Sequence, residues 1–308
     1  METKMSATVN QTLERQKINR NNTIWSKVLR SLRKSPTGML GFILLTMMIL
    51  IAVFAPFLET YDPTANNLEA VMVPPAWCDG GSTAHLLGTD YIGRDIFSQI
   101  IDGSRVSILV GLLAVAFSGT IGIIFGLISG YFGGIIDAII MRIVDAFRTI
   151  PTILMNLVIA MVLGPGIFTV IFAIGMTTWT MYARIIRGEV LSVRQREYVQ
   201  SARAIGSKNK RIIFTDVMPN VMSTFIVTCT SNIAQAIITE SSLSFLGLGI
   251  TYPTITWGSI LSAGRDYVAT AWWISTFPGI AICITCLGIM FFGDWLRDFL
   301  DPRINTNL

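Results

Sequence analysis

Six long apolar stretches dominate the sequence and limit what this chain can fold into. Each reaches at least the roughly 20 residues that an α-helix needs to cross a bilayer core of about 30 Å. Charged residues make up only 14% of the chain, against about 25% in an average soluble domain. We therefore predict an all-α integral membrane protein with six transmembrane helices, over residues 37–58, 106–128, 135–163, 167–186, 221–246 and 271–292.

The distribution of basic residues predicts how these helices are oriented. Residues 1–36 hold eight of the 23 lysines and arginines, and residues 184–211 hold eight more. Cytoplasmic loops of membrane proteins carry such an excess of positive charge. Six crossings from a cytoplasmic N-terminus place both clusters and the C-terminus inside, and leave three arginines against eight acidic residues in the outer loops. We therefore expect cytoplasmic N- and C-termini.

The chain divides into one membrane domain and two short ends. We expect a cytoplasmic segment at residues 1–36, a transmembrane domain at 37–303 and a cytoplasmic tail at 304–308. The first apolar stretch follows a long polar segment and lacks a cleavage site of small residues, so we expect a retained helix and not a removed signal peptide. Two loops stand out by length, an extracytoplasmic loop at 59–105 and a cytoplasmic loop at 188–220.

Residues that enzymes need are scarce in this sequence. His85, in the outer loop, is the single histidine, and no Gly-Lys pair exists to build a phosphate-binding loop. Cys283 and Cys286 lie in an apolar stretch, where thiols behave as small hydrophobes. We therefore expect no catalytic residue, no metal site and no cofactor on this chain. If it takes part in ATP-driven transport, the ATPase must be another polypeptide.

A polar, basic segment interrupts the apolar sequence after the fourth span. It reads EYVQSARAIGSKNKRIIFTDVMPN and covers residues 197–220. Its first part continues a helix that we predict over residues 192–205. On that helix an apolar stripe has the spacing i, i+4 and i+7 and consists of Tyr198, Ala202 and Ile205.

Glycine and proline divide this segment into an elbow. Gly206 stands where a left-handed helix cap favours glycine. Ser207 can then cap a second, short helix over residues 208–216. Pro219 ends that helix or opens the next span, because proline is tolerated in the first turn of a helix.

The short helix of the elbow carries an apolar triplet, Ile212-Ile213-Phe214. The simplest interpretation of the elbow is a solvated loop whose charges follow from topology alone. A solvated loop has no reason to expose three consecutive large apolar side chains, however. We therefore expect the short helix to dock into a groove on a partner, with surrounding charges supplied by Lys208, Lys210 and Arg211.

The elbow resembles the cytoplasmic EAA loop of ABC-importer permeases, whose pattern is E-A-A-x-x-x-G followed after nine residues by I-x-L-P. Aligned on Gly206 and Pro219, this chain has QSA (200–202) in place of EAA. It has Asp216 and Met218 in place of Ile and Leu. The resemblance implies an ATPase-coupling loop that consists of Gln200, Ser201, Ala202, Gly206, Ser207, Lys208, Lys210, Arg211, Ile213, Phe214 and Pro219.

Further motifs extend the resemblance over residues 37–303. They are HLLGTDYIGRD (85–95), GYFGGIIDAIIMRIVD (130–145), SLSFLGLG (242–249), PTITWG (253–258) and GDWLRDFLDPR (293–303). In this order they resemble the C-type subunit of the dipeptide/oligopeptide (and nickel) permease family. The resemblance implies the transmembrane domain of a type I ABC importer, in a bacterial cytoplasmic (inner) membrane.

The resemblance also implies a set of partners. A B-type permease subunit would pair with this chain and share one translocation path with it. Two cytoplasmic ABC ATPase subunits, which carry ATP and Mg, would dock on the elbows of the two permeases. An extracytoplasmic binding protein would deliver a di- or oligopeptide to the outer face.

Other functions remain open at this point. The same architecture could import nickel, a metal chelate, glutathione or another small solute. An ion-coupled secondary transporter would use Glu240 or Asp145 to carry a proton. A structural scaffold for a membrane complex is a third class.

Two groups of polar residues fall inside the predicted spans. Arg142, Asp145 and Arg148 are spaced i, i+3 and i+6, so the carboxylate of Asp145 could pair with either arginine. The second group, Asn232, Gln235 and Glu240, lies on roughly one side of the fifth span. Charges at membrane depth face a bundle interior, a headgroup region or a water-filled path. We therefore treat Arg142, Asp145, Asn232, Gln235 and Glu240 as candidates for the translocation path, against the alternatives of packing contacts and span ends.

The outer-loop motif has two interpretations as well. It consists of Gly88, Thr89, Asp90, Gly93, Arg94 and Asp95. The first interpretation is a pair of turns, in which Asp caps and Gly takes a positive φ. The second is contact with the binding protein or the B-type subunit.

Overall fold

The computed structural model describes residues 24–300, and in that range the chain forms helices joined by loops, with no β-strand. The first helices are α2 (Ile24–Lys34), α3 (Pro36–Val53), α4 (Ala55–Leu58), η1 (Leu68–Ala70) and α5 (Ile96–Phe132). The central ones are α6 (Gly134–Arg148), α7 (Thr152–Leu163), α8 (Ile167–Arg194) and α9 (Glu197–Ala204). The last are α10 (Asn209–Arg211), η2 (Ile212–Val217), α11 (Met218–Phe245), α12 (Trp257–Gly264), η3 (Arg265–Tyr267) and α13 (Trp273–Leu300).

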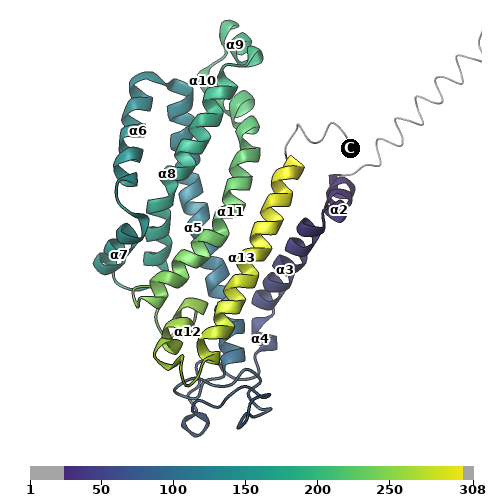
Figure 1. Cartoon of the computed structure of the whole chain (residues 1–308). Helices are drawn as coiled ribbons and strands as arrows, with labels where there is room; N and C mark the ends of the chain where they lie inside the picture. Colours follow the sequence, from purple (N-terminus) through teal and green to yellow (C-terminus); the bar gives the residue numbers. More distant parts are fainter. Residues whose placement is uncertain (1–23, 301–308) are drawn as a thin grey trace, which may run out of the picture.

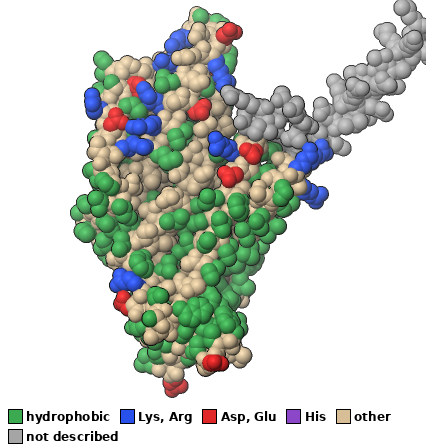
Figure 2. Space-filling view, in the orientation of Figure 1, with side chains coloured by type: hydrophobic (Ala, Val, Ile, Leu, Met, Phe, Trp, Pro, Cys, Tyr) green, Lys and Arg blue, Asp and Glu red, His purple; other side chains and the backbone are tan. Residues whose placement is uncertain are grey.

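The long helices form one elongated bundle (Figure 1). We call the end that carries α2, α9 and α10 the basic end, and the end that carries residues 59–95 and α12 the loop end. The described part of the N-terminal basic cluster and the basic residues from Arg194 to Arg211 lie at the basic end, as the charge distribution predicts, whereas Arg184 and Arg187 lie further along α8. Figure 2 shows Lys and Arg concentrated toward that end, with hydrophobic side chains over much of the bundle between the two ends. The predicted tail at 304–308, and most of the predicted segment at 1–36, lie outside the described residues.

Five helices of the described chain are long and apolar enough to cross a membrane. The third predicted span, 135–163, is not one straight helix, and this prediction was wrong in detail. It is split into α6 and α7, which are bent by 84° and make a sixth crossing if they act together. Pro151 explains the break, because it lacks an N–H and keeps Ile150 out of the helical region.

Several helices extend beyond the apolar stretches that predict them. α5 begins at Ile96, not at residue 106, because the carboxylate of Asp95 accepts a hydrogen bond from the Ser98 N–H (2.8 Å) and caps the helix. α8 runs to Arg194 and α13 to Leu300. Hydropathy marks the part of a helix that lies in lipid, whereas caps and loops decide where the helix ends.

The most extensive helix–helix contact joins α5 to α8, and three glycines on α5 make it possible. Gly122, Gly126 and Gly130 are spaced four residues apart and so lie on one face of the helix. A Cβ atom added at Gly126 would lie 2.7 Å from the Cβ of Ile186, and one at Gly130 would lie 2.7 Å from the Cβ of Val190. Small residues at such positions let two membrane helices approach closely.

Buried hydrogen bonds hold the loop end together. Asp90 accepts from the Nε of Arg94 (2.7 Å) and from the amide of Gln99 (3.2 Å). Asp95 lies 3.0 Å from Nδ1 of His85. The indole N–H of Trp273 donates to the carbonyl of Thr89 (3.0 Å), which ties the loop to the start of α13.

We predict that Gly126→Val loosens the contact between α5 and α8. The added side chain meets Ile186 at less than van der Waals distance, and overpacking of this kind costs about 1–3 kcal/mol. The thermal unfolding midpoint of the detergent-purified chain should fall. Gly188→Val is the matched control, because a Cβ there meets nothing within 4 Å. Equal midpoints for the two variants would contradict the packing argument.

We also predict that Asp95→Ala opens the loop at residues 59–95. The change removes a helix cap and leaves buried donors on Ser98 and His85 without their acceptor, at a cost of about 1–3 kcal/mol. Added protease should then cut the loop faster in the purified chain. Asp266→Ala, which removes an exposed ion pair with Arg265, should leave the cutting rate unchanged. An unchanged rate for Asp95→Ala as well would refute the role of this network.

Candidate functional site

The elbow predicted from the sequence is present at the basic end, with different helix boundaries. The predicted helix over 192–205 is two helices, because α8 ends at Arg194 and α9 begins at Glu197. Gly206 has a φ of +84°, in the left-handed region that favours glycine. The Ser207 N–H donates to the carbonyl of Ala202 (3.1 Å), and the Gly206 N–H donates to that of Arg203 (3.0 Å). This pair of bonds is a Schellman motif and ends α9 at the elbow.

The second arm of the elbow continues into the membrane helix. Residues Asn209–Phe245 form one helical run, so the predicted short helix over 208–216 is not separate. Within the run, η2 (Ile212–Val217) is a turn of π-helix. Pro219 follows it without a break. A π-helical turn accommodates local disruption of the hydrogen-bond ladder and is frequent at functional sites.

The apolar triplet divides between the bundle and the surface. Ile212 is fully buried in a cluster with Val190 of α8 and Val199 of α9. It therefore packs the second arm of the elbow against the first arm and against α8. Phe214 is 64% exposed, and Ile205 at the end of α9 is 84% exposed. Together with Tyr198, which is 44% exposed, these are the exposed large apolar side chains of residues 197–220. The prediction of a docking patch named Phe214, but it overlooked how far Ile205 projects.

Many polar residues of the elbow are exposed. Among those predicted for the coupling loop they are Gln200, Ser201, Lys208, Lys210 and Arg211, and elsewhere in residues 197–220 they are Glu197, Arg203, Asn209, Thr215 and Asn220. Ala202, Ser207 and Ile213 are partly buried, and Pro219 is exposed.

Tyr131, at the end of α5, fixes both arms of the elbow to the bundle. Its hydroxyl donates to Oδ1 of Asn209 (2.9 Å), and the guanidinium of Arg203 lies 5.3 Å from the centre of its ring. Its carbonyl accepts from Nη1 of Arg194 (3.0 Å). Sequence reasoning did not single out Tyr131 or Asn209. Tyr131 lies in the motif GYFGG, so its position was visible in the sequence but its contacts were not.

A second group of charges lies on α6 and α8. Asp145 pairs with Arg184 on α8, and not with Arg142 or Arg148 as the spacing along α6 suggested. Asp137 binds Arg187 through two hydrogen bonds, of which the one between Nη2 and Oδ2 is 2.6 Å long. Both aspartates of α6 therefore bind arginines of α8 and not arginines of their own helix. A guanidinium that approaches from a neighbouring helix can align its N–H groups with both carboxylate oxygens.

The polar residues of α11 do not share one surface, although their spacing suggested it. Gln235 is exposed, whereas Glu240 is fully buried in the chain. The carboxylate of Glu240 accepts from the hydroxyl of Ser244 (2.8 Å) and of Ser241 (3.3 Å). Ser244 in turn accepts from the N–H of Ile250 (3.1 Å). In this conformation Glu240 therefore ties α11 to the following loop, and a role in the path stays a prediction for it, as for Asn232 and Gln235.

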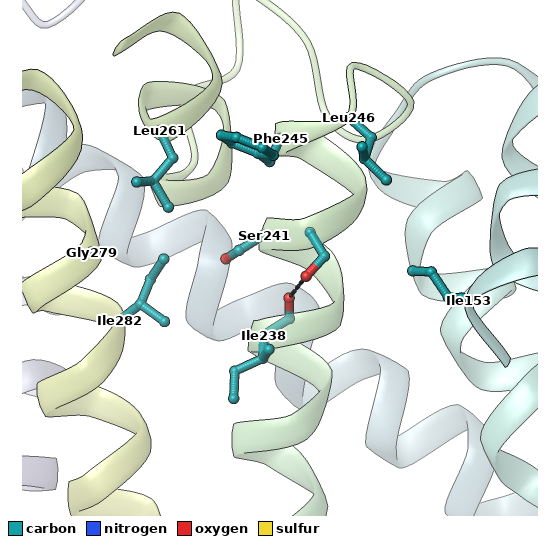
Figure 3. A pocket seen from close by; sticks show the side chains of 9 residues that line it. Ile153, Ile238, Ser241, Phe245, Leu246, Leu261, Gly279 and Ile282 are labelled. Atoms are coloured by element: carbon teal, nitrogen blue, oxygen red, sulfur yellow. Dashed lines mark hydrogen bonds between the residues drawn. The ribbon is translucent and has the colours of Figure 1, made fainter. Parts of the chain in front are cut away.

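An open cavity of about 590 Å³ lies between α7, α11, α12 and α13 (Figure 3). Its lining is largely apolar and consists of Ile153, Ile238, Ser241, Ser242, Phe245, Leu246, Leu261, Gly279 and Ile282. The hydroxyl of Ser242 donates to the carbonyl of Ile238 (2.8 Å), and that of Ser241 bonds Glu240. Both hydroxyls are thus occupied within the chain. The cavity can accept apolar groups without leaving polar atoms unpaired.

The six residues of the outer-loop motif are all buried. Gly88 and Gly93 have φ of +82° and +81°, and Asp95 caps α5, as the turn interpretation predicts. Contact with a partner stays a prediction for this motif. Among the described residues, no group of three or more His, Cys, Asp or Glu side chains could hold a metal ion.

The chain matches two family models over most of its length. Residues 122–306 match the binding-protein-dependent transport system inner membrane component. Residues 23–75 match the N-terminal TM domain of oligopeptide transport permease C.

Curated relatives align along nearly the whole chain. The "Probable D,D-dipeptide transport system permease protein DdpC" of Escherichia coli (strain K12) is 40% identical, over 90% of this chain and 91% of the relative. The di/tripeptide transport system permease protein DppC of Pseudomonas aeruginosa (strain UCBPP-PA14) is 38% identical, over 86% and 88%. The oligopeptide transport system permease protein OppC of Bacillus subtilis (strain 168) is 39% identical, over 92% and 90%.

The fold also has a solved counterpart. A chain of the MetNI methionine ABC transporter, solved in inward facing conformations, superposes with a TM-score of 0.55 at 17% identity, over 66% of this chain and 96% of that chain. The all-helical, type I ABC-importer fold predicted from the motifs is thereby confirmed. This chain belongs to the family of binding-protein-dependent transport system inner membrane components, and is a multi-pass permease protein of the inner membrane and not an enzyme.

Proposed function

We propose that this chain is one of two permease subunits of an ATP-driven importer of di- and oligopeptides. The observation that carries the proposal is the elbow, which exposes Phe214 on an arm continuous with the membrane helix α11 and Ile205 at the end of the other arm, α9. The names of relatives at 38–40% identity over about nine tenths of the chain support peptides as the substrate class.

The elbow is built to transmit a movement. An ATPase subunit that binds Phe214 and Ile205 would move α10, η2 and α11 together, because no loop separates them. Tyr131 and Ile212 would carry the same movement to α5 and α8. The path would then open alternately to the two sides as ATP binding shifts a two-state equilibrium.

The remaining parts of the importer would be separate chains. A second, B-type permease would complete the path, and two cytoplasmic ATPase subunits would hold ATP and Mg. A binding protein would deliver the peptide to the loop end. In this arrangement the basic end faces the cytoplasm, in keeping with the excess of positive charge there.

The function is tested by uptake into proteoliposomes that contain this chain with its partner subunits and binding protein. Labelled di- and tripeptides should enter only when ATP and binding protein are both present, and a protonophore should not stop them. Nickel and glutathione serve as competing solutes in the same assay. Uptake by this chain alone, driven by a proton gradient, would refute the proposal and support an ion-coupled transporter.

We predict that Phe214→Asp uncouples the ATPase from transport. A charge in the centre of an apolar docking surface should cost about 2 kcal/mol or more, which weakens ATPase binding roughly 30-fold. Copurification of the ATPase subunits and ATP-dependent uptake should both fall. The level of the chain in the membrane should not change, because the side chain lies outside the bundle.

Phe214→Leu is the matched control for this prediction. It keeps an apolar side chain at the same exposed position and should retain most ATPase binding and uptake. Normal copurification and uptake with Phe214→Asp would exclude a docking role for this surface.

A further inference from the structure

An open cleft at the loop end lies where two of the sequence motifs meet. One wall comes from residues 91–99, which span the end of the outer-loop motif and the start of α5, and the other comes from residues 252–263, which contain the motif PTITWG. Both walls belong to the loop end in Figure 1. Trp257 joins them, because its indole N–H donates to the carbonyl of Ile100 (2.9 Å) and its backbone N–H donates to the hydroxyl of Ser107 (3.1 Å). The cleft has a volume of about 320 Å³, which lies within the usual range of small-molecule sites.

Arg94 gives the cleft a charged group with an unused edge. Of the described residues that line the cleft, only Arg94 is charged, and its side chain is 10% exposed. Its Nε donates to Oδ2 of Asp90 (2.7 Å). Neither Nη atom has a hydrogen-bond partner among residues 24–300, and neither is sealed off from solvent. The guanidinium is therefore held by Nε, while the edge formed by Nη1 and Nη2 stays open to the cleft.

Asp90 orients this guanidinium but has no capacity left for the open edge. Its Oδ1 accepts from the backbone N–H groups of Ile92 and Arg94, both at 2.9 Å. Its Oδ2 accepts from Nε of Arg94 and from Nε2 of Gln99 (3.2 Å). An ionised carboxylate offers about four lone-pair sites, so Asp90 is saturated. Two parallel N–H groups on one edge of a guanidinium match the two oxygens of a carboxylate, and no carboxylate in the cleft lining competes for them.

The other lining residues suit the end of a peptide. The side chain of Gln99 is 2% exposed with its residue, and its Oε1 has no hydrogen-bond partner among residues 24–300, so it can accept from a ligand N–H. Ile255 and Ile260 supply apolar contact for a ligand side chain. No acidic side chain lines the cleft to receive an ammonium group. A ligand with a carboxylate, a neighbouring N–H and no amine nearby is the C-terminal residue of a peptide, and a free amino acid does not meet this description.

We propose that the loop-end cleft binds the C-terminal carboxylate of a peptide on the edge of Arg94 that Asp90 leaves free. The proposal rests on the proposed function, in that it takes this peptide to be the transported solute. The volume holds about one terminal residue, and the cleft is open, so the rest of the peptide would extend outward. Peptides of different length would therefore bind by the same end.

The first test measures peptide binding without transport. The assembled importer is placed in lipid nanodiscs without binding protein or ATP, and saturation-transfer NMR follows acetyl-Ala-Ala and its C-terminal amide. The acid should bind about tenfold or more tightly than the amide, which lacks the carboxylate. Free alanine should compete poorly, because its ammonium group finds no acidic partner in the cleft.

Variants then assign the binding to Arg94. Arg94→Lys keeps a cation beside Asp90 but loses the two-pronged edge, and should weaken binding of the acid by about tenfold. Arg105→Lys is the matched control and should change nothing, because Arg105 is an exposed residue outside the cleft lining.

A second variant leaves the Asp90–Arg94 pair untouched. Ala263 lines the cleft, and Ala263→Phe should fill it and abolish binding of acetyl-Ala-Ala. Val268→Phe adds comparable bulk at an exposed position outside the lining and should bind the peptide normally. If Arg94→Lys fails to assemble, this pair of variants decides.

The outcomes separate the inference from the proposed function. Equal binding of the acid and the amide, full binding by Arg94→Lys or Ala263→Phe, or strong competition by alanine would each overturn the inference. Unchanged peptide binding by Arg94→Lys together with weaker docking of the binding protein would also overturn it, and would assign the cleft to an acidic side chain of that protein. If the wild type binds the acid but shows no ATP-dependent peptide uptake, the proposed function is refuted and the carboxylate site stands.

Discussion

The close contact between α5 and α8 is the constraint on which the rest of the structure depends. Gly122, Gly126 and Gly130 bring the two helices so near that side chains from α8 fill the space where Cβ atoms would lie. The contact extends to the basic end, where Arg194 at the end of α8 donates a hydrogen bond to the carbonyl of Tyr131 near the end of α5. The elbow is attached to these two residues, and α6 is attached to α8 by two ion pairs. The elbow and α6 are thus both attached to the α5–α8 pair.

Much of the fold could be predicted from the sequence because the bilayer imposes a length and an apolar character on each crossing. The elbow was also predictable, because a glycine after the last periodic residue of a helix marks a left-handed cap. Gly206 has the positive φ that such a cap requires. The break at 149–151 was missed although Pro151 was visible, because the apolar character of 135–163 continues through it. Hydropathy cannot distinguish one straight crossing from two bent halves.

Side-chain partners were the part that sequence spacing could not supply. Asp145 was expected to bind along its own helix and instead binds Arg184, which lies 39 positions further along the chain. Glu240 was placed beside Gln235 by helical spacing, but it is buried and accepts from Ser244 of the same helix, which in turn accepts from Ile250 of the following loop. The partner of Asp145 lies on another helix, whose position is decided by tertiary packing. The hydrogen-bond partners of Glu240 lie on α11 itself, and it is the loop bonded to Ser244 through Ile250 that the local pattern does not reveal.

The elbow departs from the EAA pattern at Gln200, and the structure gives a physical reason why the departure is tolerated. The amide Nε2 of Gln200 donates to the carbonyl of Gln195 (3.1 Å), in the turn between α8 and α9. The last carbonyls of a helix lack partners within the helix, so this bond supports the end of α8. A glutamate at this position is ionised at neutral pH and only accepts hydrogen bonds, so it could not make the same contact. Gln200 therefore exchanges a negative charge on the elbow surface for a hydrogen bond to the turn between α8 and α9. In the proposed docking of the elbow on an ATPase subunit, the absence of that negative charge would favour an acidic rim on the receiving groove.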